Sequence, residues 1–199
     1  MSISSKRLWR DRLQTIRHYY TSPRFALIDL AFGFVALFMN PYRICRKFNQ
    51  KKRLQNVYSY GETPLATYQR IAAICQIGPE DTWVEMGAGR GKGCFWLAHF
   101  LKCEVIGIEW VPSFIFVARA LQSLFRIKNI RFACTDFEKA DISSATVIYL
   151  YGSWPKLKIP QGAKVISISE PLPDCQVLKT FWVRYPWGRT TAFLQQQKK

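Results

Sequence analysis

The sequence predicts an α/β protein with a doubly wound, mostly parallel seven-stranded sheet, a C-terminal antiparallel hairpin and a basic helical N-terminal extension. Three observations predict it. Strand-length apolar runs alternate with helix-length segments from residue 56 onward, the last two runs flank a turn sequence, and positive charge gathers in the first quarter of the chain. The 199 residues are 49% hydrophobic and 15% aromatic, which is enough for one packed domain and excludes a disordered protein.

Five short apolar runs are expected to be parallel strands, with helices on both faces of the sheet. The strands are predicted over 82–86, 104–109, 130–134, 145–151 and 163–169, and the helices over 64–76, 91–102 and 112–125. Two further runs, 177–184 and 190–195, flank the turn sequence Tyr185–Gly188, so they are expected to pair as an antiparallel hairpin.

Residues 1–55 form a separate basic extension in this prediction, and the domain covers 56–199. The extension holds 12 basic and 2 acidic side chains, a net charge of +10 out of the +16 of the whole chain. Its segment 25–39 is apolar except for Asp29, and as a helix it would rise about 22 Å, short of the roughly 30 Å of a bilayer core. Three interpretations stay open: an in-plane helix on an anionic lipid surface, a helix packed on the protein's own core, and an arm that binds nucleic acid.

Six scattered cysteines contain no Cys-x-x-Cys pair, and only two histidines accompany them. This pattern gives no reason to expect a metal site. We expect the cysteines to act as small buried hydrophobic residues in a reducing compartment.

Glycines at positions 87, 89 and 91 come directly after a predicted strand and before a predicted helix. Glycine there lets the backbone turn tightly and approach a ligand at the helix N-terminus. The spacing differs from a dinucleotide fingerprint, whose third glycine would stand where this chain has Lys92, and no P-loop Gly-Lys-Ser/Thr follows.

Carboxylates stand at the ends of three successive predicted strands. Glu85 lies two residues before the first glycine, where it would face a positively charged amine of a ligand. Glu109 ends the second strand, a position that suits hydrogen bonds to ribose hydroxyls. Asp136 follows the third strand and precedes Phe137, whose ring is placed to stack on a base.

This set resembles the class I S-adenosylmethionine (SAM)-dependent methyltransferases, and the terminal hairpin resembles their antiparallel seventh strand. A narrower resemblance rests on Tyr-Gly-Glu-Thr-Pro at 60–64 together with Gly-Ile-Glu, Asp-Phe and Ala-Thr-Val-Ile-Tyr-Leu further on. These are similar to the protein-lysine methyltransferases without a SET domain, which include histone-lysine enzymes and membrane-anchored enzymes that methylate the ATP synthase c-subunit. The similarity spans roughly residues 58–196.

The resemblance implies SAM as cofactor and assigns roles to individual residues. Glu85, Gly87 and Gly89 would hold the methionine end, Glu62 and Thr63 would close over it, Glu109 would bind the ribose, and Asp136 with Phe137 would take the adenine. The methyl acceptor would be a lysine amine of a protein substrate. The enzyme would work in the cytoplasm or an organelle matrix, and its attachment to a membrane is left open.

An acceptor channel is expected from the aromatic residues Tyr60, Tyr149, Tyr151 and Trp154, with Tyr151 and Tyr60 as the catalytic candidates. The chain departs from the histone enzymes here, because Tyr151-Gly152-Ser153 replaces their Asn-Asn-Phe. Two alternatives to a lysine enzyme therefore stay open: a methyltransferase acting on RNA or a lipid headgroup, and a non-catalytic binding module with the same fold.

Overall fold

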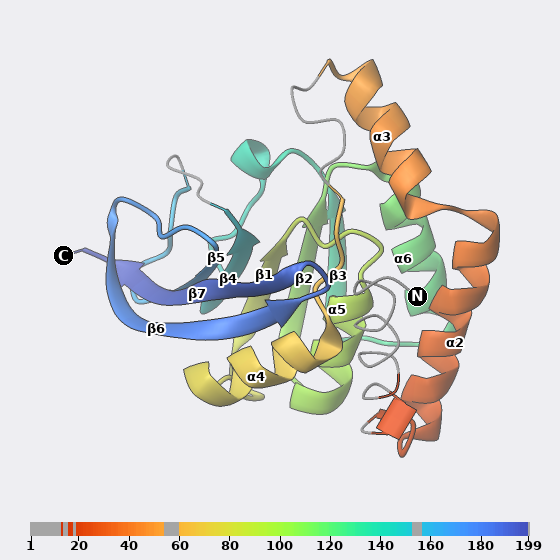
Figure 1. The fold of residues 1–199 in the computed structure, drawn as a ribbon, viewed down its shortest axis with the longest axis horizontal. Helices are drawn as coiled ribbons and strands as arrows, with labels where there is room; N and C mark the ends of the chain where they lie inside the picture. The colour runs from red at the N-terminus through yellow and green to blue at the C-terminus, as the bar shows by residue number, and fades with distance from the viewer. Residues whose placement is uncertain (1–12, 14–15, 18, 54–59, 153–156, 199) are drawn as a thin grey trace.

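A computed structural model describes residues 13, 16–17, 19–53, 60–152 and 157–198. It contains one seven-stranded sheet in the order β3-β2-β1-β4-β5-β7-β6, with β7 antiparallel to both of its neighbours (Figure 1). The strands are β1 Thr82–Met86, β2 Glu104–Glu109, β3 Ile130–Cys134, β4 Val147–Tyr151, β5 Lys164–Ile168, β6 Cys175–Tyr185 and β7 Gly188–Gln197. This order and the terminal hairpin confirm the predicted fold class.

Five α-helices of the described residues precede or connect the strands, and four of them are α2 Pro23–Phe38, α3 Pro41–Lys51, α4 Leu65–Cys75 and α6 Pro112–Leu124. The connection from β1 to β2 is α5 Lys92–Trp96, which continues as the π-helical turn η1 Leu97–Leu101. A short 3-10 helix, η2 Phe137–Lys139, follows β3. The first three strands have the predicted bounds. The bounds of the other predicted elements differ from the prediction by a few residues at their ends.

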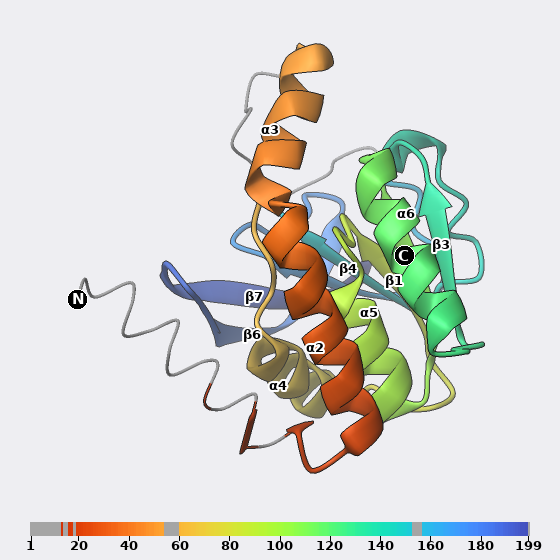
Figure 2. The same ribbon diagram turned by 90° about the vertical axis from the view of Figure 1, so that its right-hand side faces the viewer.

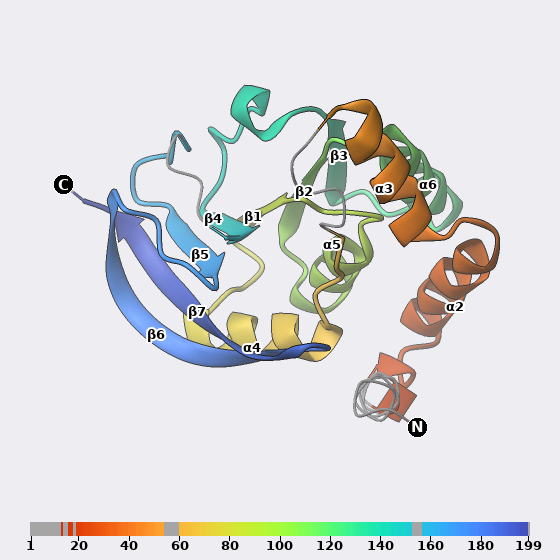
Figure 3. The ribbon, with the colours of Figure 1, turned by 45° about the horizontal axis from the view of Figure 1, so that its top comes forward.

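The helices are distributed unequally over the two faces of the sheet. Side chains of α2, α4, α5 and α6 join one hydrophobic core with one face of the strands. Within the described residues, the opposite face is covered by η2 and by connecting loops around Ile142, Leu157 and Leu172. Figure 3 shows α4 and α5 on one side of the sheet and those loops on the other. Helical cover on both faces was expected, but the segments after β3, β4 and β5 are too short for long helices.

The apolar segment of the N-terminal quarter is one helix, α2, that packs on the domain. Ser22 caps it by accepting a hydrogen bond from the Phe25 amide, and Pro23 occupies its first turn. Phe25, Ile28 and Phe32 are buried in the core shared with α5. The chain then turns at Asn40, which caps α3, and α3 projects past the body of the domain (Figure 2).

No single described helix is long and apolar enough to cross a bilayer. Helices α2 and α3 reach that length only as a pair, and the pair is bent by 60°. All six cysteines are free thiols, of which five are buried, as expected of small hydrophobic residues.

Candidate functional site

The glycine loop between β1 and α5 lies at the carboxyl edge of the parallel strands. The amides of Gly87 and Ala88 both donate to the Ile108 carbonyl, at 2.9 Å each, which ties the loop to the end of β2. At Gly91, where φ is +85°, a Cβ atom would lie 2.7 Å from the ring of Phe132. The third glycine is therefore required by packing, while Gly87 and Gly89 also have positive φ, a conformation that favours glycine.

Glu109 lies at the end of β2 and bonds to the same loop. Its Oε2 accepts from the Gly89 amide at 2.9 Å, and its Oε1 accepts from the Val111 amide at 2.8 Å. Burial raises the pKa of this carboxyl, and the amide donors act in the opposite direction. The Trp110 amide contributes a further hydrogen bond to this carboxyl, and since a carboxylate has about four acceptor positions, capacity remains for a ligand hydroxyl.

Phe137 completes this edge of the sheet. A Cβ atom at Gly87 would lie 3.6 Å from its ring, which places the ring beside the glycine loop. Asp136 caps η2 by accepting from the Glu138 amide. The glycine loop, Glu109 and the Asp136–Phe137 pair thus gather at one edge, and their donors, carboxylates and ring fit the ribose and base of SAM. The individual roles stay predictions.

Glu85 differs from its predicted role. Its side chain is buried, with Oε1 accepting from the Tyr68 hydroxyl and Oε2 from the Cys94 thiol at 3.4 Å. Burial raises its pKa to about 7. Both oxygens are therefore engaged below the glycine loop by protein donors, a geometry that supports α4 and α5 rather than a free carboxylate aimed at a ligand amine.

The loop 60–63 folds back onto the glycine loop through an ion pair. The Arg90 guanidinium donates to Glu62 Oε1, at 2.9 Å from Nε, and the Tyr60 hydroxyl donates to the same oxygen at 2.7 Å. Arg90 also donates to the Phe32 carbonyl of α2 at 3.4 Å. Glu62 is thus tied to the glycine loop by a residue that the sequence analysis did not single out, and its role at the methionine end stays a prediction.

Thr63 connects the same loop to the sheet instead. Its Oγ1 lies 2.9 Å from the Tyr149 hydroxyl and 3.5 Å from that of Tyr185, and the two phenols are 2.7 Å apart. Tyr149 is buried, and burial raises the pKa of Tyr185 to about 12. Tyr149 is therefore a packed structural phenol at the end of this network and not an exposed channel wall.

Three aromatic rings form what we call the aromatic mouth, at the carboxyl end of β4. Tyr151 meets Tyr185 edge-on at 5.6 Å between ring centroids, and Trp187 stacks on Tyr185 at 4.8 Å. Tyr151 and Trp187 are about half exposed, and Ser169 donates to the Tyr151 hydroxyl at 3.1 Å. Rings presented to solvent next to the cofactor edge can receive the acceptor.

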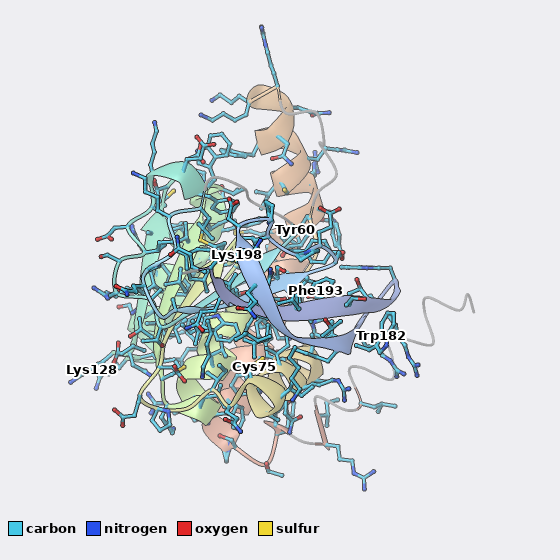
Figure 4. All side chains as sticks on the ribbon, turned by 90° about the vertical axis from the view of Figure 1, so that its left-hand side faces the viewer. Tyr60, Cys75, Lys128, Trp182, Phe193 and Lys198 are labelled. Carbon is cyan, nitrogen blue, oxygen red and sulfur yellow. The ribbon has the colours of Figure 1, made fainter. Side chains whose placement is uncertain are left out.

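The predicted catalytic pair is divided between these two groups. Tyr151 belongs to the aromatic mouth, whereas Tyr60 packs against Phe114 of α6 and lies beside Gly89, on the glycine-loop side. Figure 4 labels Tyr60 at the upper edge of the strands. A common channel for both stays a prediction, and Trp154 lies outside the described residues.

Tyr185 and Trp187 were treated only as turn residues in the sequence analysis. Their signal was present, since a Tyr-Pro-Trp-Gly turn places two large aromatic rings where small polar residues are usual. The partner of Glu85, Tyr68, carried no such signal because it stands 17 residues away on a different element.

Comparisons with known proteins agree with this geometry at the level of the fold. No family model matches the chain, and no curated protein matches it. An RNA methyltransferase from Salinibacter ruber, solved with S-adenosyl-L-homocysteine, is 22% identical with a TM-score of 0.59 over 70% of this chain and 95% of its own. The tRNA (m1A58) methyltransferase TrmI from Aquifex aeolicus is 17% identical, with a TM-score of 0.51 over 70% and 71%.

The [4+2]-cyclase SpnF also matches, at 9% identity and a TM-score of 0.54 over 68% of this chain and 82% of its own. The chain therefore has the class I SAM-dependent methyltransferase fold. Because that fold also occurs in a cyclase, the activity has to be argued from the site.

Proposed function

We propose that this chain is a SAM-dependent methyltransferase that acts on RNA. The observation that carries the cofactor assignment is the joint position of the glycine loop, Glu109 and Phe137 at one edge of the sheet. SAM supplies an activated methyl group for direct transfer to a nucleophile. The residues of this chain then need only to bind the cofactor, orient the acceptor and exclude water.

Glu109 would accept the ribose hydroxyls, since its oxygens are already oriented by the Gly89 and Val111 amides. Arg90 holds Glu62 above the glycine loop, so the loop 60–63 would cover the methionine end. The acceptor would approach from the aromatic mouth, where the Tyr151 hydroxyl can accept a hydrogen bond from an N–H group.

Calorimetric titration with SAM and with S-adenosylhomocysteine tests the cofactor. Glu109→Ala should lose binding because it removes the ribose acceptor, and it should stay folded with a lowered melting temperature because the Gly89 and Val111 amides lose their acceptor. Glu104→Ala is the matched control, since it deletes an exposed carboxylate at the opposite end of the same strand. Binding that survives in Glu109→Ala would contradict the site, and a folded wild-type chain that binds neither compound would favour the non-catalytic module.

RNA as the acceptor is supported by charge. The chain carries +16 with a pI near 9.9, which attracts polyanions at long range. Two of the structural neighbours are an RNA methyltransferase and a tRNA methyltransferase. Incubation with radiolabelled SAM and separated RNA, protein and lipid fractions tests this class, with label expected in the RNA.

A protein lysine is the second candidate, and the aromatic mouth favours it. Rings such as Tyr151 and Trp187 can surround an alkylammonium group, and an apolar channel favours the neutral amine that must attack. Label that enters the protein fraction at lysine, and not the RNA, would replace the first candidate by this one.

We also propose that α2 attaches the enzyme to an anionic lipid surface. Its outward side exposes Leu27, Leu30, Phe34, Leu37 and Phe38 by 57 to 79%, although the opposite side is buried in the core. A helix that is apolar all round is normally covered on every side. No acidic residue occurs between Asp29 and Glu62, whereas six basic residues do. The exposed apolar side of α2, which we call the stripe, is therefore followed by positive charge that suits anionic headgroups.

A further inference from the structure

A surface groove of about 670 Å³ lies between α4 and the edge strand β6, away from the glycine loop. Three arginines line it, Arg70 from α4, Arg184 from β6 and Arg189 from β7, and no acidic side chain is among its lining residues. We call it the arginine groove. Three guanidinium groups without a lining carboxylate give this surface a strong preference for anions.

The walls of the groove are held together by hydrogen bonds across the seam. Arg70 Nε donates to the Trp182 carbonyl at 2.7 Å, and Thr67 Oγ1 donates to the Arg184 carbonyl at 2.5 Å. These bonds occupy acceptors on the edge strand that would otherwise be free to pair with another strand. The groove is therefore preformed, with one guanidinium already oriented in it.

The other two arginines lie directly opposite each other in the hairpin. Arg184 pairs with Arg189 in the register of β6 and β7, and both are exposed. Like charges at directly opposed positions of an antiparallel pair destabilise the sheet. An anion that binds between or beside the two guanidinium groups reduces their repulsion. The placement of Arg184 opposite Arg189 therefore points to a ligand with closely spaced negative charges.

Trp182 adds a stacking surface to this charge. It lines the groove, is 61% exposed and stands two residues from Arg184 on the same face of β6. An exposed indole beside guanidinium groups is the combination by which proteins bind unpaired bases and phosphates together. A peptide carboxylate or a lipid headgroup would use the arginines but not the indole.

The groove leads to the proposed acceptor end of the site. Pro64 and Thr67 line it and follow Thr63, which bonds to Tyr149 in the middle of β4. On the strand side, Arg184 lies one residue before Tyr185 of the aromatic mouth, with its side chain on the other face of β6. The groove and the aromatic mouth are therefore built from adjoining segments, residues 63–67 and 184–189.

We propose that the arginine groove binds the phosphates and bases of single-stranded RNA and directs the strand toward the aromatic mouth. This rests on the proposed function, because it supplies the docking site for an RNA acceptor. It makes a separate claim, namely that RNA affinity resides in these residues and not in the overall charge.

The test is fluorescence anisotropy with a labelled single-stranded RNA of about 12 nucleotides, titrated at several salt concentrations. The double variant Arg184→Gln/Arg189→Gln should bind at least about tenfold more weakly, with a slope of log K against log salt shallower by about 1.4, the value for two lost phosphate contacts. Trp182→Ala should weaken binding by about fivefold or more with little change in slope, because it removes stacking and no charge.

Lys128→Gln/Lys139→Gln is the control, since it removes the same charge from exposed positions outside the groove. Figure 4 shows Lys128 on the opposite side of that view from Trp182. The RNA affinity of the lysine double variant should stay within twofold of wild type. Equal losses in the control and in the groove variant would overturn the proposal, as would an acidic peptide or anionic vesicle that competes as well as RNA.

SAM titration of the same variants separates this proposal from the proposed function. The groove variants should stay folded and bind SAM with unchanged affinity, and the double variant should melt at or above the wild-type temperature because it removes two opposed like charges. If the wild type binds no SAM but the groove variants still lose RNA affinity, the proposed function fails and the groove assignment stands. If SAM binds normally and RNA affinity is unaffected by the groove variants, only the groove assignment fails.

Discussion

Glu85 places a carboxyl group in the core directly below the glycine loop. It is 4% exposed, and its partners are a phenol and a thiol rather than a cation. Burial without a compensating positive charge disfavours the ionised form, which raises its pKa to about 7. The residue is thus a source of pH-dependent stability next to the cofactor edge.

The pH dependence has a definite sign. Because the folded pKa is raised above the ordinary value near 4.5, the folded state binds the extra proton between these two values. The stability contribution is fully present below pH 4.5 and is lost as the pH rises through 7. Relative to Glu85→Gln, which cannot ionise, the wild type should lose about 3 kcal/mol of unfolding free energy over this range.

Urea unfolding of both proteins at several pH values from 4.5 to 8 measures this difference. Glu104→Gln provides the control, since its side chain is exposed at the start of β2. A constant difference between wild type and Glu85→Gln across the range would show that the carboxyl is ionised in the folded state throughout.

The location of a residue was predictable where one strand end determines its neighbourhood. Glu109 lies beside the glycine loop because the end of β2 adjoins the end of β1, and its bond to the Gly89 amide follows from that place, whereas its role toward ribose stays a prediction. The environment of Glu85 was not, because it depends on Tyr68 of α4, whose packing angle no local pattern encodes. Arg90 was overlooked for the same reason, since its partners Glu62 and Phe32 come from two other segments.

Among the elements, α2 makes the most unexpected connection. Its bounds were close to the prediction, and of the three interpretations the structure supports packing on the protein's own core for its inner side. The acid in the apolar run has a partner there: Asp29 pairs with Lys92 at the start of α5 and accepts from the Tyr20 hydroxyl at 3.0 Å. The helix is thus bonded to the segment that follows the glycine loop.

Asp29→Asn should lower the free energy of unfolding by about 1–3 kcal/mol, because it leaves the half-buried Lys92 ammonium without its counter-charge while preserving the shape of the side chain. It should also weaken SAM binding several-fold, since Lys92 follows directly on Gly91 of the loop. Denaturant unfolding and calorimetry measure both effects. Asp174→Asn, at an exposed site, should match the wild type in both; equal behaviour of the two variants would rule out a role for α2 in holding the loop.

At the scale of the whole molecule, the arginine groove and the exposed apolar side of α2 lie on different parts of the surface. The arginine groove lies at the β6 edge of the sheet, whereas α2 and α3 lie by α5 and α6 (Figures 1 and 3). The sequence assigned +10 of the +16 to the extension but did not show that part of the remaining charge forms a groove, because the groove needs Arg70 of α4 to meet the distant hairpin of β6 and β7. The proposals for lipid and RNA therefore concern different residues and can be tested independently.

The lipid proposal predicts binding to vesicles that contain anionic lipid and weak binding to purely zwitterionic ones, measured by co-sedimentation. Leu30→Ser/Phe34→Ser should reduce the partition coefficient at least about tenfold, because each apolar side chain transferred from water contributes about 1.5–3 kcal/mol. Both residues lie on the exposed side of α2, so the variant should keep the wild-type melting temperature.

Phe116→Ser/Leu124→Ser on α6 is the matched control, since these side chains are 72% and 68% exposed on another helix. Vesicle binding that falls equally in both variants would assign the affinity to general surface hydrophobicity, and a wild type that dimerises through α2 without binding vesicles would identify a second copy as what covers the stripe.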